Sequence, residues 1–146
     1  MGDKRHAYAH DTRVPVDRSK QELDLLLQKH GASQRGMGVD DERGETVSYF
    51  TLDGRQILLR IPMPGRTEYR SQESFEQACR ARWRAIVLIT KAKLEHIAMG
   101  LSTVQDEFMA NIRLPNGSTV AEAIAPGLEE MYANGRMPPL LGMGTR

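Results

Sequence analysis

The longest apolar pattern in the chain recurs at helical spacing over about residues 74–99. At about 100° per residue, one stripe carries mostly large side chains, namely Phe75, Cys79, Trp83, Ile86, Thr90, Leu94 and Ile97. A second face carries mostly small ones, namely Ala78, Ala81, Ala85, Leu88, Ile89 and Ala92. A surface helix ordinarily has one apolar stripe and a polar back. We therefore predict a long helix with its bulky side against a sheet and its alanine side against another helix.

An earlier helix is predicted for about residues 15–31, with three leucines on one face (Leu23, Leu26 and Leu27). Ser19 and Glu22 have the spacing of a capping box at its start, and Gly31 can end it. Three strands are expected after it, at residues 32–39, 46–52 and 56–61. Asp53-Gly54 is a strong signal for a tight hairpin, so the strands form an antiparallel meander.

The C-terminal third predicts two further helices. Ser102 and Thr103 can cap a short one that runs through Met109, and Thr119 begins a longer one that ends near Gly135. Pro126 is expected to kink or divide the longer helix, because proline lacks the N–H donor. We expect these helices to pack on the alanine side of the long helix. If they cover only part of it, either a twofold partner covers the rest or residues 103–141 wrap back to complete the cover, with Leu140 and Leu141 sealing its edge.

The predicted fold class is α+β: an N-terminal helix, a three-stranded antiparallel meander, a long central helix, and C-terminal helices packed on it. At 146 residues the chain is long enough for one well-formed core. Trp83 is expected to be buried against the sheet, near Phe50 and Leu58. The expected organisation is a flexible arm at residues 1–13, one domain at 14–141 and a tail at 142–146.

Targeting signals are not visible in the sequence. The start leads into no apolar segment of a secretory signal, and the apolar run at residues 85–89 is far short of the ~20 residues of a membrane span. The single cysteine, Cys79, has no partner in the chain for a disulfide and is expected to be a buried thiol. These features predict a protein of the cytoplasm with no membrane partner.

The sequence contains no recognisable catalytic or metal-binding pattern. No serine lies in a glycine-rich elbow, and Cys79 is on a predicted core face. His6 and His10 have the spacing of two metal ligands but lie in the polar arm without a glutamate between them. No phosphate-binding glycine motif is present. We therefore expect a protein that is not an enzyme and has no cofactor and no metal site.

One acidic turn leaves an alternative open. Asp40, Asp41 and Glu42 could bind a divalent cation together with Asp53, or they could form a solvated turn. Their spacing does not match a calcium-binding loop.

Charge gives the one positive indication of function. Residues 55–93 carry nine basic and three acidic side chains, whereas residues 1–54 and 94–146 are both net acidic. The net charge of +1 conceals this basic middle third. Arginines interleaved with an aromatic residue suit a phosphate backbone and an unstacked base.

The candidate nucleic-acid-binding residues are Arg66, Tyr69, Arg70, Arg80, Arg84 and Lys91. The last three share one side of the long helix, and Arg82 and Lys93 form a second line. The alternative is that these long side chains border a buried helix and keep their charges in water. If the interface is real, replacing Arg66, Arg70, Arg80 and Arg84 with alanine weakens binding and leaves thermal stability nearly unchanged.

Several motifs resemble those of a family of small uncharacterised proteins of bacteriophages and prophages. They comprise Tyr8-Ala-His-Asp-Thr-Arg-Val-Pro-Val-Asp-Arg-Ser19 continuing to Ala32, residues 78–85 with 91–95, residues 114–120, and residues 135–141. The resemblance covers most of the chain, least near residues 64–74. It implies a phage origin and a bacterial host cell, and it implies no activity.

The order helix, three strands, helix is also that of the double-stranded RNA-binding domain. The Gly-Pro-x-His turn of that domain is absent, and the second helix opens at Glu73 without its lysine cluster. Its function is therefore not transferred. The first functional hypothesis is a non-enzymatic phage accessory protein that binds DNA or RNA. The alternative is a protein-interaction module or inhibitor acting on a host or phage protein; formation of a homodimer is left open.

Overall fold

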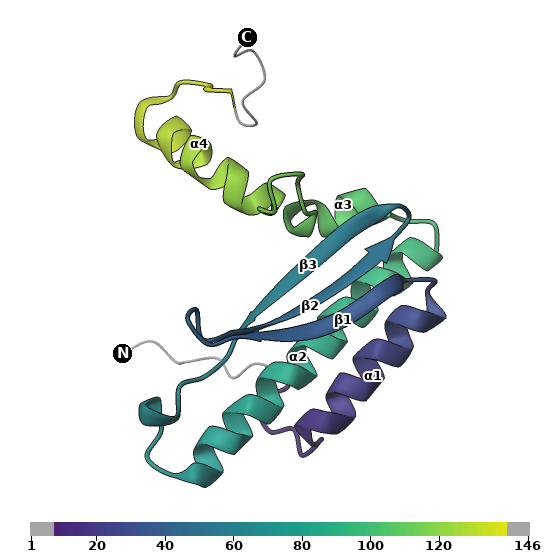
Figure 1. Cartoon of the computed structure of the whole chain (residues 1–146), viewed down its shortest axis with the longest axis vertical. Helices are drawn as coiled ribbons and strands as arrows, with labels where there is room; N and C mark the ends of the chain where they lie inside the picture. The colour runs from purple at the N-terminus through teal and green to yellow at the C-terminus, as the bar shows by residue number, and fades with distance from the viewer. Residues whose placement is uncertain (1–7, 140–146) are drawn as a thin grey trace.

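The structure is a computed structural model that describes residues 8–139 (Figure 1). Its elements are α1 (Val16–Lys29), β1 (Ser33–Asp40), β2 (Glu45–Leu52), β3 (Arg55–Pro62), η1 (Arg66–Glu68), α2 (Gln72–Ala98), α3 (Val104–Phe108), η2 (Met109–Asn111) and α4 (Val120–Asn134). The fold is α+β, as predicted. Among the helices of residues 8–139, none combines the length and apolarity needed to cross a bilayer.

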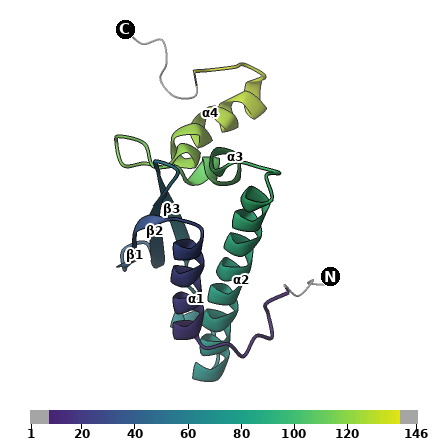
Figure 2. The same cartoon turned by 90° about the vertical axis from the view of Figure 1, so that its right-hand side faces the viewer.

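The sheet has the strand order β1-β2-β3 and is antiparallel throughout. Its second turn is the predicted hairpin: Asp53 and Gly54 have φ of 50° and 71°, the left-handed pair that this turn type requires. Both α1 and α2 cover the same face of the sheet (Figure 2). The other face carries Tyr49, whose ring lies directly over Gly36 of the neighbouring strand.

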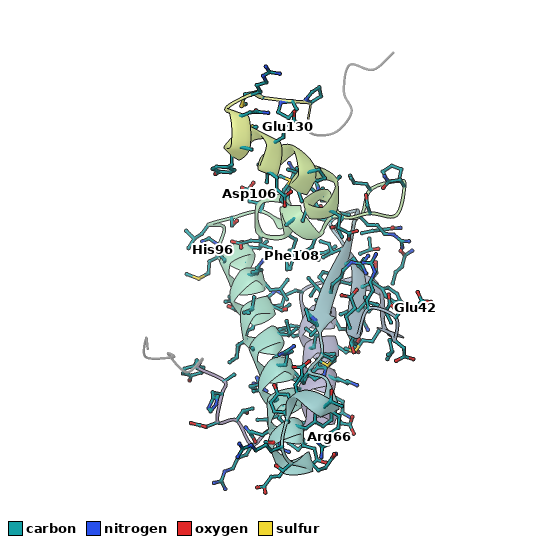
Figure 3. All side chains as sticks on the ribbon, turned by 90° about the vertical axis from the view of Figure 1, so that its left-hand side faces the viewer. Glu42, Arg66, His96, Asp106, Phe108 and Glu130 are labelled. Atoms are coloured by element: carbon teal, nitrogen blue, oxygen red, sulfur yellow. The ribbon has the colours of Figure 1, made fainter. Side chains whose placement is uncertain are left out.

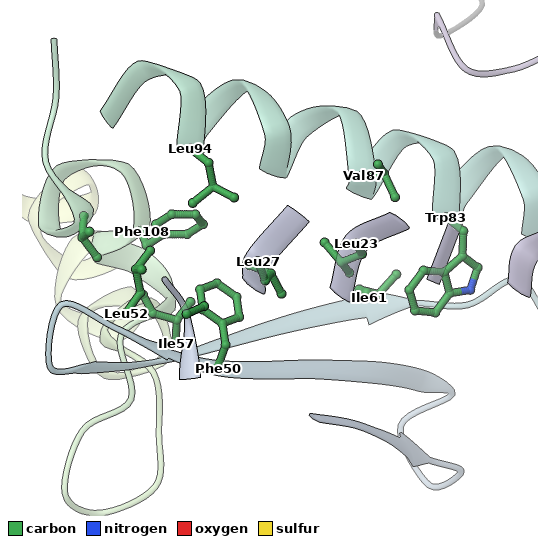
Figure 4. Packing of buried hydrophobic residues seen from close by; sticks show 12 residues of the cluster. Leu23, Leu27, Phe50, Leu52, Ile57, Ile61, Trp83, Val87, Leu94 and Phe108 are labelled. Carbon is green, nitrogen blue, oxygen red and sulfur yellow. The ribbon is translucent and has the colours of Figure 1, made fainter. Parts of the chain in front are cut away.

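The core lies between these helices and the sheet (Figure 4). Its fully buried large side chains include Leu23, Leu27, Phe50, Ile57, Ile61, Trp83, Val87, Leu94 and Phe108. Trp83 is 2% exposed, which confirms that the bulky stripe faces the sheet. Because side chains alternate along β3, Ile57 and Ile61 face the core and Leu58 faces the other way. The expected contact of Trp83 with Leu58 is therefore wrong.

The capping box predicted at Ser19 and Glu22 is also wrong. The helix begins one turn earlier, at Val16, with Pro15 at the cap position and no side-chain cap. Ser19 lies inside α1 and is fully buried, while Glu22 pairs with α2. The first turn instead uses proline, whose fixed φ and missing N–H suit a helix start.

The C-terminal helices depart most from prediction. Thr103 and Thr119 do cap α3 and α4, and Gly135 ends α4 in the left-handed conformation. Only α3 packs on α2, near its C-terminal end, whereas α4 packs on η2 and points away from the body of the domain (Figures 1 and 2). The alanine side of α2 is thus not covered by α4. Pro126 lies inside α4 without dividing it.

The chain before α1 lies against α2. The side chain of Gln77 donates hydrogen bonds to the carbonyls of His10 and Thr12, at 3.0 and 2.8 Å, and Ala9 is buried. Residues 1–7 of the predicted arm, and Leu140 and Leu141 of the predicted seal, lie outside the described residues.

Candidate nucleic-acid interface

The helices α1 and α2 run side by side in the same direction (Figure 2). Across the seam between them, Arg84 donates two hydrogen bonds to Glu22: Nη1 to Oε2 at 2.5 Å and Nη2 to Oε1 at 3.0 Å. The Arg84 side chain is only 14% exposed. The hydrogen bond from Arg84 is the main reason that the pKa of the Glu22 carboxyl is lowered, and it raises the pKa of Arg84 in turn.

Other basic residues besides Arg84 line the seam. The charges of Lys91 and Arg18 also lower the pKa of Glu22, so both lie within electrostatic reach of it. Arg18 and Lys29 line a shallow hollow of about 460 Å³ along α1. One turn before Arg84, Arg80 holds Gln77 Oε1 and shares a second hollow with Arg13.

We name this set the seam strip: Arg13, Arg18, Lys29, Arg80, Arg84 and Lys91. Three carboxylates lie beside the strip. Glu22 is held by Arg84, and Glu76 lines the hollow that contains Arg13. Glu95 Oε1 lies 3.7 Å from His30 Nε2. The six cations of the strip outnumber these three carboxylates, so the seam keeps a net positive charge although Glu22 neutralises Arg84.

The predicted loop residues do not join this strip. Arg66 donates to Gln72 and to the Tyr69 carbonyl at 2.8 and 2.9 Å, beside the N-terminus of α2 (Figure 3). The Tyr69 ring packs toward Phe75, with 6.2 Å between ring centroids. Phe75 and Arg84 are nine residues apart, which places them about 180° apart around the helix. Arg66 and Tyr69, with Arg70 next in sequence, thus lie on the opposite flank of α2 from Arg80, Arg84 and Lys91.

The second line of basic residues on α2 serves the fold. Arg82 donates to the Pro62 carbonyl at the end of β3, at 2.5 Å. Lys93 donates to the Glu107 carbonyl at 2.8 Å and lies 5.2 Å from the centroid of the Phe108 ring. Both side chains tie α2 to neighbouring elements.

Sequence reasoning missed Arg13, Arg18 and Lys29. Arg18, Glu22 and Lys29 recur at helical spacing, which was visible in the sequence. The sequence does not show which side of α1 faces α2. Only that orientation brings Arg18 and Lys29 next to Arg84 and Lys91.

The acidic turn does not assemble a cation site with Asp53. Asp40–Asp41–Glu42 and Asp53 lie at opposite ends of β2, about 25 Å apart at the rise of a strand. The Asp40 carboxylate instead accepts the Arg43 N–H at 3.1 Å. Within residues 8–139 no three His, Cys, Asp or Glu side chains are grouped to hold a metal ion.

The histidines and the cysteine considered as candidate ligands or nucleophiles lie in surroundings that do not form a metal site within residues 8–139. His10 pairs with Asp11, and His96 with Glu107 of α3. His6 lies outside the described residues. Cys79 is half-buried, and loss of solvent raises the pKa of its thiol, which makes it a weaker nucleophile at neutral pH.

No family model, curated protein or solved structure matches this chain.

Proposed function

We propose that this chain is a non-enzymatic accessory protein of a phage or prophage that binds duplex nucleic acid through its phosphate backbone. The observation that carries the proposal is the seam strip, in which cations from two helices and the preceding segment line one track. Phosphate contacts supply most of the affinity in sequence-independent binding.

The dimensions of the strip suit a duplex. From Arg80 to Lys91 it extends eleven residues along α2, about 16 Å at the helical rise. That length corresponds to about five phosphates at 3.4 Å per step along one strand. No aromatic side chain belongs to the strip, and Tyr69 packs toward Phe75 on the other flank. Backbone contact is therefore favoured over base stacking, which single-stranded binding uses.

The test is fluorescence anisotropy with labelled double-stranded DNA, double-stranded RNA and single-stranded probes. For about five phosphate contacts, affinity for the duplex should fall roughly 10²–10³-fold between ~50 and ~200 mM salt. The variant R18A/K91A should reduce the salt slope by about 2, because each lost phosphate contact reduces it by about 1. The matched control is R113A/R136A, which removes two exposed positive charges away from the seam.

The outcomes separate the hypotheses. If R18A/K91A and the control reduce the salt slope equally, the duplex is attracted by the net charge of the protein. That result contradicts a binding site at the seam strip. No binding of any probe at ~50 mM salt, where screening is weak, ends the proposal. If the nuclease-treated protein then retains one stoichiometric partner protein, the alternative of a protein-interaction module stands in its place.

A further inference from the structure

Helix α4 is anchored at its first turn and extends away from the domain beyond it (Figures 1 and 3). Glu122 accepts a hydrogen bond from Arg60 of β3 at 3.0 Å, and the Val120 N–H donates to the Ile112 carbonyl at 3.0 Å. After this turn, the side chains of α4 are half-buried or exposed. The anchors fix the direction of α4, so it cannot fold back on α2 of its own chain while they hold.

The free part of α4 is amphipathic. Ile124, Leu128 and Met131 share a stripe, and Leu128 is 40% exposed. Tyr132 borders the stripe and is 90% exposed. The charged residues of α4 are all acidic, namely Glu122, Glu129 and Glu130. This stripe can pack on an apolar surface, and the negative charge of α4 favours a surface flanked by basic residues.

Such a surface lies on α2, opposite its buried stripe. We name as the outer face of α2 the residues Ala85, Leu88, Ile89, Ala92 and Met99. Ile89 is 53% and Met99 70% exposed, and Leu101 extends the apolar surface beyond the helix. Between Gln77 and Leu94 the helix has five basic residues and no acidic one, and they border this face on both sides. Glu95 and His96 follow between Ala92 and Met99, and His96 pairs with Glu107.

The two surfaces match in length, shape and charge. The α4 stripe from Ile124 to Tyr132 is about 12 Å long, and the outer face from Ala85 to Ala92 is about 10 Å long. Alanines at positions 85 and 92 permit helix axes to approach to about 8 Å. The charged residues of α4 are all acidic, whereas α2 has five basic residues and no acidic one between Gln77 and Leu94. Opposite charge therefore favours this pairing over contact between two copies of α2.

We propose that the chain forms a twofold dimer in which α4 of each copy packs on the outer face of α2 of the other. Each copy then gives one helix and receives one, so the interface closes on itself. The dimer leaves Arg13, Arg18 and Lys29 of the seam strip open. Lys91 borders both surfaces, so the two proposals share that residue and are tested with different variants.

The test is light scattering coupled to gel filtration, with two substitutions in separate chains. At about 100 µM the protein should elute at twice its 16.4 kDa chain mass. I89D and L128D, each at an exposed position, should both give monomers. An equimolar mixture of the two variants should restore a weaker dimer, because an intact α4 from I89D meets an intact outer face from L128D.

The controls decide what a negative result means. L25D introduces the same chemistry at another exposed helical position, on α1, and should remain dimeric. Circular dichroism of each variant checks that helices and thermal transition are retained. If a variant loses its fold, E129K/E130K replaces it: this pair leaves the apolar stripe intact and should weaken the dimer at least tenfold at low salt.

Three results overturn the proposal: a wild-type monomer at about 100 µM, a dimer that survives L128D, or a mixture of folded variants that stays monomeric. The second result indicates contact between two outer faces, and the third indicates that α4 and α2 do not meet.

Discussion

The pair Arg84–Glu22 allows a sharp test of whether the contact between α1 and α2 contributes to the stability of the fold. R84M keeps much of the apolar stem of the arginine and removes both hydrogen bonds to Glu22. Exposed ion pairs contribute about 0.2–1 kcal/mol, and bidentate arginine pairs lie at the upper end. Glu22 is 43% exposed, so solvent screening limits the gain, whereas Arg84 is mostly buried. We therefore expect a coupling free energy of about 1 kcal/mol.

The dependence of this coupling on pH has a definite sign. The pKa of Glu22 is lowered in the folded protein, first of all by the hydrogen bond from Arg84. A carboxyl with a lowered folded pKa stabilises the fold above its unfolded value, about 4.3, and loses that contribution as the pH falls through the folded value. The coupling should be constant between about pH 6 and 8 and should shrink as the solution is acidified below pH 4.

The assay is a double-mutant cycle of R84M, E22Q and R84M/E22Q. Urea unfolding of each is followed by the fluorescence of Trp83, the single tryptophan, at neutral and acidic pH. A coupling below about 0.3 kcal/mol at neutral pH, or one of equal size in acid, would refute the reasoning. A coupling of the expected size contradicts the sequence-based expectation that Arg84 can be removed with stability nearly unchanged.

Two further predictions follow from burial. W83A should cost about 3–5 kcal/mol in urea unfolding followed by circular dichroism, because the ring is 2% exposed and Lys20 lies 5.1 Å from its centroid. A loss under about 1 kcal/mol would contradict the packing, and W83F should lose less than W83A. The Cys79 thiol, whose pKa is raised by burial, should react with a disulfide reagent at pH 8 more slowly in the folded protein than in urea. Equal rates would show that the thiol is freely exposed.

Local chemistry explains which parts of the fold could be predicted from sequence. The Asp53-Gly54 turn, the caps at Thr103 and Thr119, and the end at Gly135 each depend on a few adjacent residues, and all four are confirmed. The predicted cap at Ser19 had the correct spacing but failed. Its position belongs to the core face of α1, and Pro15 already begins the helix.

Features that depend on the relative orientation of helices could not be predicted. The sequence placed Arg80, Arg84 and Lys91 together because one helix holds them. It could not join Arg18 to that group, nor separate Tyr69 from it, because both facts depend on what packs on each flank of α2. The apolar pattern of α4 indicated a helix that needs a covering surface, and it carried no information on which surface.

The distribution of residues around α2 gives a physical reason why one of its apolar sides is buried in the domain and the other is exposed. Apolar residues occupy two sides of the helix, whereas the sheet and α1 bury only the stripe that contains Trp83, Val87 and Leu94. Five cations separate this stripe from the outer face, and burying a second face against the same domain would require desolvating them. The chain therefore leaves the outer face at the surface. Covering it with an acidic helix lowers that desolvation cost, because the glutamates replace part of the hydration that the cations lose. The effect of a substitution on α2 should then depend on the side of the helix that it changes. Substitutions facing the sheet should lower stability, and those facing α1 should lower both stability and nucleic-acid binding. Substitutions on the outer face should change association alone.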